Sequence, residues 1–331
     1  MRHISAAQLD RLLTYSTLAD AIRDAFADHM LFAPQRLHFQ TGAGDTNEPL
    51  LIMPAWRPGG VSIIKLVTVR PTNVDCGRPT VQGLLAVFEG ESGAPVATID
   101  ATALTRWRTA SASLLAARYL ARKSSRVMAM LGAGAMARHL IQAYCSEFLL
   151  EEIVIWSRTY AHAQRLAAEV AVPPEVRVMP KRELAEAIAV ADIVSCATLA
   201  ERGLVCGTWV KPGTHVDLVG AFTPTMRESD DDLIRRAAIY VDVRAGALLE
   251  AGDLVQPIAS GVITVRDIRG DLADLATGRS SGRVCDESVT LFKSVGHAIE
   301  DFAAAELVMG AEKNQPGDDV PRETSRLTAR P

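Results

Sequence analysis

The chain has 331 residues, more than one hydrophobic core usually organises, so we expect two domains. Apolar residues make up 48% of the sequence and charged residues 22%, a balance that is typical of globular proteins and excludes a disordered or fibrous chain. The net charge of −4 argues against a nucleic-acid-binding surface.

Targeting and metal-binding signals are absent from the sequence. The N-terminal stretch MRHISAAQLDRLLTY is amphipathic and contains an acid, unlike the apolar core of a signal peptide. No run of about 18 apolar residues predicts a membrane span. The five cysteines have no paired C-x-x-C spacing, and the seven histidines have no metal-ligand spacing. We therefore expect a cytoplasmic protein with reduced thiols, no metal and no membrane partner.

The N-terminal third predicts helices followed by an antiparallel sheet. Apolar residues over 5–30 have a helical spacing that is interrupted around Ser16 and Thr17, where a second helix could be capped. From about 36 to 100, runs rich in β-formers are separated by glycine, proline and asparagine: LLIMPAW, VSIIKLVTV, PTVQGLLAVFE and APVATID. An alanine-rich helix is predicted from Thr105 to about Arg122.

From residue 126, apolar strands alternate with helices, beginning with RVMAMLG, AMARHLIQAYCSEF and EEIVIWS. This alternation predicts an α/β fold with a doubly wound parallel sheet of Rossmann type, covered by helices on both faces. A further helix is predicted from about 287 to 309, which could return to the first domain. The last 20 residues are polar with three prolines and predict a mobile tail.

Gly132, Gly134 and Ala137 form a G-x-G-x-x-A turn between a predicted strand and a predicted helix. In dinucleotide-binding folds the first glycine permits the tight turn, the second lets a pyrophosphate approach the backbone, and the small third residue lets helix and strand pack. The helix N-terminus then offers free N–H groups and partial positive charge to phosphates. The turn therefore predicts a dinucleotide site, with a purely structural turn as the alternative.

The end of the second strand indicates which dinucleotide binds. An acid there usually binds a free ribose 2′-hydroxyl, whereas a 2′-phosphate needs a cation and small donors. Ser157, Arg158 and Thr159 follow the strand EEIVIW without an acid, so NADPH is favoured over NADH unless Arg158 is an ordinary solvated charge. Ligands also bind at the carboxyl ends of the other parallel strands. The candidates there are Ala197, Thr198, Val219 and Gly220, with ordinary strand-to-loop transitions as the alternative.

Three cations are candidates for a substrate site. Lys65 lies in the run SIIKLVTV, and strand alternation places it on one face with Ile63 and Val67. It is either an edge lysine or a desolvated one, and burial would lower its pKa enough for proton exchange near neutral pH. Arg108 and Arg36 could each bind a carboxylate with two hydrogen bonds, or each could be a surface arginine.

Several segments, in this order, resemble the ornithine cyclodeaminase/μ-crystallin family: KLVTV, PTVQGLLAVFEGESGAPVATIDATALTRWRTASAS, LGAGAMA, WSRT, VGAFTPTMRESD and LFKSVG. The resemblance spans residues 34–305. It implies a substrate-binding and dimerisation domain over 1–118 with 296–312, an NAD(P)-binding Rossmann domain over 119–295, and a flexible tail over 313–331. It also implies a homodimer.

The resemblance also implies roles for single residues. Lys65 matches the family's active-site lysine, and Arg108 matches the arginine at the substrate carboxylate or the nicotinamide. Arg36 and Val295 match substrate-binding residues. The matches to cofactor-contacting residues are Thr80, Ala135, Met136 and Ser294.

One departure from the family bears on the reaction. Ornithine cyclodeaminases carry an aspartate two residues after the glycine of the segment that matches VGAFTP, and this chain has Phe222 there. We therefore expect an NAD(P)H-dependent imine reductase that converts Δ1-pyrroline-2-carboxylate, or the six-membered Δ1-piperideine-2-carboxylate, to L-proline or L-pipecolate. The alternatives are an ornithine cyclodeaminase, an alanine-type amino-acid dehydrogenase, and a non-catalytic NADPH-binding protein of the crystallin type.

Overall fold

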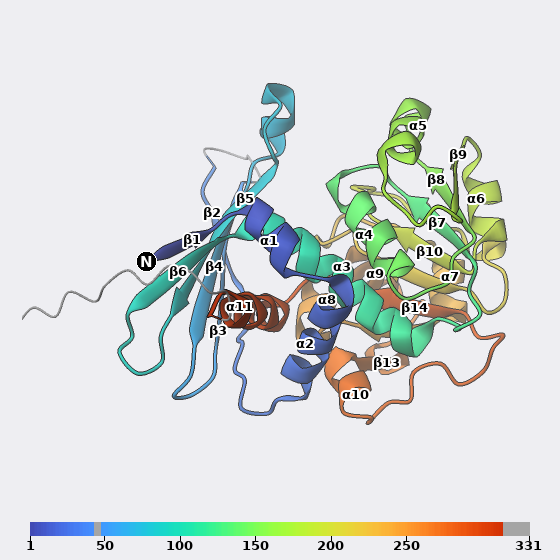
Figure 1. The fold of residues 1–331 in the computed structure, drawn as a ribbon. Helices are drawn as coiled ribbons and strands as arrows, with labels where there is room; N and C mark the ends of the chain where they lie inside the picture. Colours follow the sequence, from blue (N-terminus) through green and yellow to red (C-terminus); the bar gives the residue numbers. More distant parts are fainter. Residues whose placement is uncertain (43–47, 314–331) are drawn as a thin grey trace, which may run out of the picture.

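The computed structural model describes residues 1–42 and 48–313, and two β-sheets organise them (Figure 1). The first sheet has the strand order β1-β6-β5-β4-β3-β2. Its strands are β1 (Arg2–Ile4), β2 (Leu37–Gln40), β3 (Pro49–Trp56), β4 (Ser62–Val69), β5 (Val81–Phe88) and β6 (Pro95–Asp100). The predicted antiparallel pairing is confirmed from β2 to β6, whereas β1 runs parallel to β6.

Four helices pack beside this sheet: α1 (Ala6–Leu12), α2 (Tyr15–Ala27), α3 (Ala101–Leu120) and α11 (Ala298–Lys313). The predicted break between the first two helices is two to three residues too late, because Thr14 and not Ser16 or Thr17 caps α2 by accepting a hydrogen bond from the Thr17 N–H. The predicted start of α3 is also too late, because Asp100 caps that helix from the end of β6. A short 3₁₀ turn, η1 (Pro71–Cys76), links β4 to β5.

Helix α3 is buried on nearly every side. It contacts α2 and α11 beside the first sheet and α4, β11 and β14 of the second half of the chain. Its alanine and serine residues let these neighbours approach closely, which explains a composition without an amphipathic stripe. The helix therefore joins the two halves of the structure.

The second sheet has eight parallel strands in the order β13-β12-β14-β11-β10-β7-β8-β9. They are β7 (Val127–Leu131), β8 (Glu152–Trp156), β9 (Arg177–Lys181), β10 (Ile193–Cys196), β11 (His215–Leu218), β12 (Ala238–Val241), β13 (Ile268–Asp271) and β14 (Thr290–Lys293). Its helices are α4 (Ala135–Cys145), α5 (Tyr160–Glu169), α6 (Leu184–Val190), α7 (Asp231–Arg236), α8 (Arg244–Glu250), α9 (Gly252–Ala259) and α10 (Leu272–Ala276), with 3₁₀ turns η2 (Gly207–Trp209) and η3 (Val265–Asp267).

Successive residues of the parallel strands point into two different cores. Met128 and Met130 join the core that contains α3, α4 and α5, whereas Ala129 and Leu131 join the core beneath α6, α7 and α9. Helices therefore cover both faces, and the predicted doubly wound parallel sheet is confirmed.

The helix predicted over 287–309 is wrong in its first half. Residues 290–293 form β14, which lies between β11 and β12 and is buried on both faces. A buried central strand is a continuous apolar run, and periodicity cannot separate such a run from a helix. Gly296, with φ +85°, then turns the chain, and α11 begins at Ala298.

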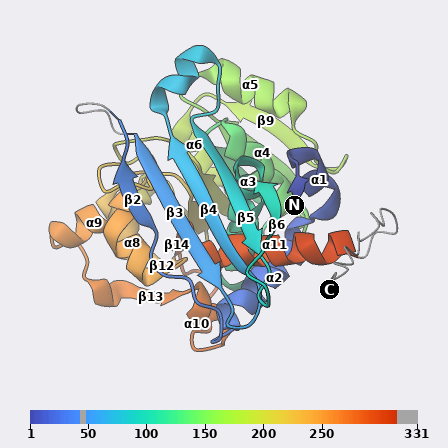
Figure 2. The ribbon, with the colours of Figure 1, turned by 90° about the vertical axis from the view of Figure 1, so that its left-hand side faces the viewer.

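Helix α11 returns to the first sheet, where it contacts β3, β4, α2 and α3 (Figure 2). The domain boundaries given above stay predictions. The predicted tail lies outside the described residues, apart from Lys313 at the end of α11. Within the described ranges, no helix combines the length and hydropathy that crossing a bilayer requires.

Candidate active site

Lys65 and Arg108 are buried where the first sheet meets α3 and α11. Lys65 is 1% exposed, and its Nζ donates to Asp301 Oδ1 at 2.7 Å and lies 2.6 Å from Oδ2. Arg108 Nη1 donates to Glu300 Oε2 at 2.7 Å, and its Nε lies 3.4 Å from Asp301 Oδ1. The burial of Lys65 confirms the alternation argument for β4, because Ile63 and Val67 are buried on the same face.

Burial moves the pKa values of Lys65 and Glu300 toward neutral pH. Desolvation lowers the pKa of Lys65 to about 8, although the Asp301 carboxylate opposes the shift. Desolvation raises the pKa of Glu300 to about 7, although Arg108 opposes it. Such pKa values are suited to proton exchange under physiological conditions.

Arg36 reaches the same region from the loop before β2. Its guanidinium makes a two-pronged ion pair with Glu250 at the end of α8, with Nε donating to Oε1 at 3.0 Å. Its Nη2 also donates to the carbonyl oxygen of Val295 at 3.1 Å. The pair therefore connects the N-terminal part of the chain to the parallel-sheet part.

The loop between β14 and α11 is held by Asp242, which follows β12. Asp242 Oδ2 accepts hydrogen bonds from the backbone N–H groups of Val295 at 2.8 Å and Gly296 at 2.6 Å. A Cβ added at Gly296 would lie 2.4 Å from Arg108 Nη1. A glycine is therefore needed here both for φ +85° and for contact with the guanidinium.

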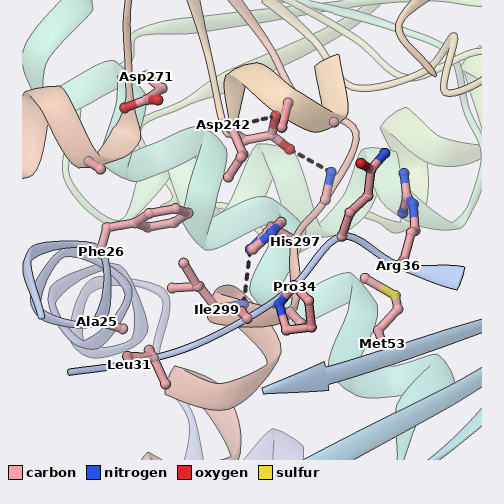
Figure 3. Close-up of a pocket in the computed structure, with 18 of the residues that line it drawn as sticks. Ala25, Phe26, Leu31, Pro34, Arg36, Met53, Asp242, Asp271, His297 and Ile299 are labelled. Carbon is pink, nitrogen blue, oxygen red and sulfur yellow. Dashed lines mark hydrogen bonds between the residues drawn. The ribbon is translucent and has the colours of Figure 1, made fainter. Parts of the chain in front are cut away.

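A cavity of about 350 Å³ adjoins this cluster (Figure 3). Arg36, Asp242 and His297 lie around it, together with apolar side chains from α2, β3 and α11. It reaches the cations through two lining residues: Met53, which pairs with Lys65 in the sheet register, and Gly296, which touches Arg108. The cavity is therefore next to the cations and large enough for a small molecule.

The ends of β7, β10 and β11 meet at the carboxyl edge of the parallel sheet. A Cβ at Gly132 would lie 2.6 Å from the Ala197 oxygen, and one at Gly220 would lie 2.1 Å from the Thr198 oxygen. Val219 donates its N–H to the carbonyl oxygen of Cys196 at the end of the neighbouring strand β10. Ala221 follows with φ +48°, an uncommon conformation for a buried residue with a side chain.

A buried acid–base network that the sequence did not reveal supports this edge. Glu228 Oε1 accepts from the Thr198 N–H at 2.7 Å and from its hydroxyl at 2.8 Å. Lys293 Nζ donates to the carbonyl oxygens of Leu218 and Gly220 and lies 3.6 Å from Asp253 Oδ2. Desolvation raises the pKa of Glu228 to about 7. The network fixes the loops that carry the predicted cofactor residues.

Gly134 supplies a test of whether a dinucleotide fits. It caps α4, has an ordinary φ of −84°, and a Cβ added there would meet no protein atom within 4 Å. The protein itself therefore does not require glycine at this position, whereas a close pyrophosphate would. Ala135 and Met136 follow in the first turn of α4, whose free N–H groups suit phosphate oxygens.

A cavity of about 710 Å³ opens beside this turn, and it is rich in cations. The three guanidinium groups of Arg106, Arg138 and Arg165 line it, together with the two acids Asp10 and Glu169. No hydrogen bond or ion pair within the described ranges engages Arg106 or Arg165. This excess of positive charge suits a ligand that carries phosphates.

Ser157, Arg158 and Thr159 lie between β8 and α5, and both Arg158 and Thr159 are exposed. Arg158 makes no hydrogen bond or ion pair within the described part of the chain. Arg182, which the sequence analysis did not single out, stacks over the Tyr160 ring at 3.9 Å. Two cations therefore flank the start of α5.

The structure brings most of the predicted residues into two groups. The first contains Arg36, Lys65, Arg108, Ser294 and Val295, and the second contains Gly132, Ala197, Thr198, Val219 and Gly220. The backbone N–H of Ser294 donates to Leu218 and links the groups. Thr80 lies after η1, and within the described part of the chain its one hydrogen bond is between its carbonyl oxygen and the Arg70 N–H. Phe222 lies beside Ala221 and is 38% exposed.

The acids that pair with these cations had no usable signal in the sequence. Glu300 and Asp301 look like the ordinary acidic first turn of a helix, and Glu250 and Asp242 look like solvated charges in a charged region. The roles of Glu300, Asp301 and Glu250 depend on contacts across about 200 residues of chain, such as the 236 residues between Lys65 and Asp301, and Asp242 acts on a loop more than 50 residues away.

Comparisons with known proteins agree with this geometry. The profile of the ornithine cyclodeaminase/mu-crystallin family matches residues 3–315. The Δ1-pyrroline-2-carboxylate reductase of Paracoccus denitrificans is 38% identical over 290 residues, which cover 87% of this chain and 91% of that protein.

Two solved structures have the same fold over nearly the whole chain. The first is Thermococcus litoralis Δ1-pyrroline-2-carboxylate reductase in complex with NADH and L-proline, with a TM-score of 0.90, 30% identity, and coverage of 95% of this chain and 98% of that one. The second is an archaeal alanine dehydrogenase dimer with bound NAD, with a TM-score of 0.86, 28% identity, and coverage of 95% and 97%.

Proposed function

The chain belongs to the ornithine cyclodeaminase/mu-crystallin family, as its sequence resemblance predicted, and from this premise we propose that it is an NAD(P)H-dependent imine reductase. Its substrate is Δ1-pyrroline-2-carboxylate, with Δ1-piperideine-2-carboxylate as the six-membered alternative, and its products are L-proline and L-pipecolate. The observation that carries the proposal is the buried pairing of Lys65 and Arg108 with Asp301 and Glu300, next to a cavity and beside the carboxyl edge of the sheet.

In this reaction the arginines bind the substrate carboxylate. Arg108 is anchored through Nη1 to Glu300, which leaves Nη2 without a hydrogen-bond partner among the described residues. Arg36 is anchored to Glu250 through Nε and Nη2, which leaves Nη1 to donate to the substrate carboxylate. Two guanidinium edges that are already oriented reduce the entropy lost when the carboxylate binds.

Lys65 holds a proton at the imine nitrogen. Its ammonium form is stabilised by Asp301, while burial keeps its pKa near 8, so the ammonium can donate its proton to the imine nitrogen, and the neutral amine then accepts a hydrogen bond from the iminium N–H. Protonation of the nitrogen makes the adjacent carbon more electrophilic. A bound nicotinamide would supply the hydride to that carbon.

The cofactor would be held by Gly134, Ala135 and Met136 at its phosphates and by Thr198, Val219, Gly220 and Ser294 at its nicotinamide end. We propose NADPH as the preferred form, because Arg158 and Arg182 flank the start of α5 and no acid follows β8. NADH remains a usable alternative, and the Thermococcus litoralis relative was solved with it.

A cyclodeaminase is disfavoured by Phe222. The phenyl ring at this position offers no base for the second amine of ornithine. It can instead pack against a cyclic imine, whose ring carries no second amine.

The test is NADPH oxidation, followed at 340 nm, by the purified protein with Δ1-pyrroline-2-carboxylate. Parallel assays use NADH as the reductant, pyruvate with ammonia, and ornithine with NAD. Rapid oxidation that depends on the imine supports the reductase. Ammonia release from ornithine, or oxidation only with pyruvate and ammonia, would instead identify the cyclodeaminase or the alanine-type dehydrogenase. Tight NADPH binding without any turnover would identify a non-catalytic binding protein.

We also propose a homodimer formed through the outer face of the first sheet. Leu37, Ile52, Leu66 and Leu84 are cross-strand neighbours in one row, and three of them are 39–53% exposed. No helix lies in front of β3 and β4 in Figure 2, where this face is toward the viewer. An exposed apolar sheet face of this kind suits a second copy of the chain. Sedimentation of the Leu66→Glu/Leu84→Glu variant as a monomer, beside a dimeric wild type, would support it, and unchanged sedimentation would refute it.

A further inference from the structure

The first turn of α11 contains two consecutive acids that are both completely buried. Glu300 and Asp301 are 0% exposed, and each pairs with a cation from a different element: Arg108 of α3 and Lys65 of β4. Consecutive helix residues point about 100° apart, which is why one helix can reach two separate partners. Buried carboxylates are costly unless they are paired, so this arrangement stabilises both cations in defined positions.

The two pairs differ in geometry. Both oxygens of Asp301 lie within 2.7 Å of Lys65 Nζ, whereas Arg108 Nε is 3.4 Å from Oδ1, so this carboxylate contacts the ammonium more closely than the guanidinium. Glu300 binds Arg108 through Oε2 alone, and its Oε1 is buried without a hydrogen-bond partner among the described residues. Glu300 therefore anchors the guanidinium at Nη1, and Gly296 packs directly against the same group, since a Cβ added there would lie 2.4 Å from Nη1 and 2.7 Å from Nη2.

Among the described residues, the charged groups that shift the pKa of Lys65 are Asp301 and Glu300 of α11 and Arg108 of α3. Beyond them, Asp242 acts on Glu300 and Arg108, and His297 interacts with Asp301 and Arg108. Of the three groups, Arg108 disfavours the ammonium form of Lys65, and Asp301 is the one in direct contact that favours it.

We propose that Asp301 and Glu300 are positioning residues with separate tasks: Asp301 keeps Lys65 protonated for the imine nitrogen, and Glu300 orients Arg108 for the substrate carboxylate. This inference rests on the proposed function. It predicts that two neighbouring residues on one helix affect different kinetic parameters.

Asp301→Asn keeps the size of the side chain and removes its charge. Without the carboxylate the pKa of Lys65 falls further, because burial is then opposed less. We expect kcat with imine and NADPH to fall about 100-fold at neutral pH and the basic limb of the kcat/KM profile to move to lower pH. Asp301→Glu retains the charge and is expected to keep the basic limb of the wild type.

Glu300→Gln keeps an acceptor for Arg108 and removes the charge that anchors it. We expect KM for the imine to rise about 10-fold, with kcat within about 3-fold of the wild-type value and the basic limb moved less than in Asp301→Asn, because Asp301 and not Glu300 pairs with Lys65. The matched control is Glu306→Gln, since Glu306 lies on the same helix and pairs with Arg57, away from the cluster. This control should leave both parameters and the pH profile unchanged.

A second measurement needs no turnover. Folding lowers the pKa of Lys65 from its ordinary 10.5 to about 8, so the folded chain binds fewer protons than the unfolded chain between those values, and stability rises with pH there. In Asp301→Asn this rise of stability with pH should begin at lower pH. Between about pH 6 and 8, the Tm of Asp301→Asn should therefore rise more steeply with pH than the Tm of Glu306→Gln.

The outcomes separate this inference from the function on which it rests. If wild type oxidises no NADPH with the imine but Tm of Asp301→Asn shows the shifted pH dependence, the proposed function fails and the control of Lys65 by Asp301 stands. The inference is overturned if Asp301→Asn keeps the basic limb and the Tm profile of the control, or if Asp301→Glu moves the limb. It is also overturned if Glu300→Gln lowers kcat without raising KM.

Discussion

The cation cluster and the glycine turn are built in opposite ways. The glycine turn is a single stretch of backbone between β7 and α4, and its properties come from residues that are neighbours in sequence. The cluster joins β4, α3 and α11, and its strongest contacts connect residues 192 and 236 positions apart. A local site can thus be inferred from a motif, whereas a site made of long-range ion pairs depends on the whole fold.

The largest expected effect is at Lys65. Lys65→Ala should lower kcat/KM for the imine about 1,000-fold, because the proton at the imine nitrogen is lost, while the Kd for NADPH stays unchanged. Steady-state kinetics and a fluorescence titration of NADPH measure the two quantities. Near-normal turnover of Lys65→Ala would show that the cluster has only a structural role and is not a reaction site to be compared with the glycine turn.

Gly296→Ala should give the next largest effect. The new Cβ would meet Arg108 Nη1 at 2.4 Å, so the guanidinium must move, and we expect kcat/KM to fall about 100-fold. Gly59→Ala is the matched control, since φ is +71° there and no atom lies within 4 Å of the added Cβ. Both variants should lose about 1 kcal/mol of folding free energy to backbone strain, measured by urea unfolding. Gly296→Ala should lose more than this, because the buried guanidinium must move, and only this variant should lose activity. Equal activities would refute the contact argument.

The glycine turn itself contains a smaller test. Gly134→Ala should leave Tm within about 2 °C of wild type, because the added Cβ has open space, while the Kd for NADPH rises about 10-fold. Gly132→Ala should instead destabilise the fold, since φ is +109° and the Cβ would lie 2.6 Å from the Ala197 oxygen. If Gly134→Ala binds NADPH normally, the turn does not carry the pyrophosphate.

The smallest effect concerns the choice of cofactor. Arg158→Ala should reduce the preference for NADPH over NADH about 10-fold, because a charge-assisted hydrogen bond to the 2′-phosphate is lost. The ratio of the two kcat/KM values measures it. Arg177→Ala is a suitable control, because that exposed arginine pairs with Glu152 at the other end of β8. An unchanged ratio would assign Arg158 to the solvated surface.

The sequence alone determined the features that repeat along the chain or lie within a few residues of each other. Alternating strands and helices predicted the parallel sheet, and the period of two in β4 predicted that Lys65 shares one face with Ile63 and Val67, which the structure shows to be buried. These patterns are reliable because backbone geometry sets them locally. The first half of the helix predicted over 287–309 failed, because β14 is apolar on both faces and therefore carries no period at all.

Only the tertiary structure decided which charges pair. Nothing near Lys65 in the sequence indicates Asp301, and nothing near Arg36 indicates Glu250, 214 residues away. Charged residues are usually solvated, so an acid in a helix carries no signal of burial until the fold encloses it. The return of α11 to the first sheet encloses Glu300 and Asp301, and in that low-dielectric position two ordinary carboxylates hold the cations of the candidate active site.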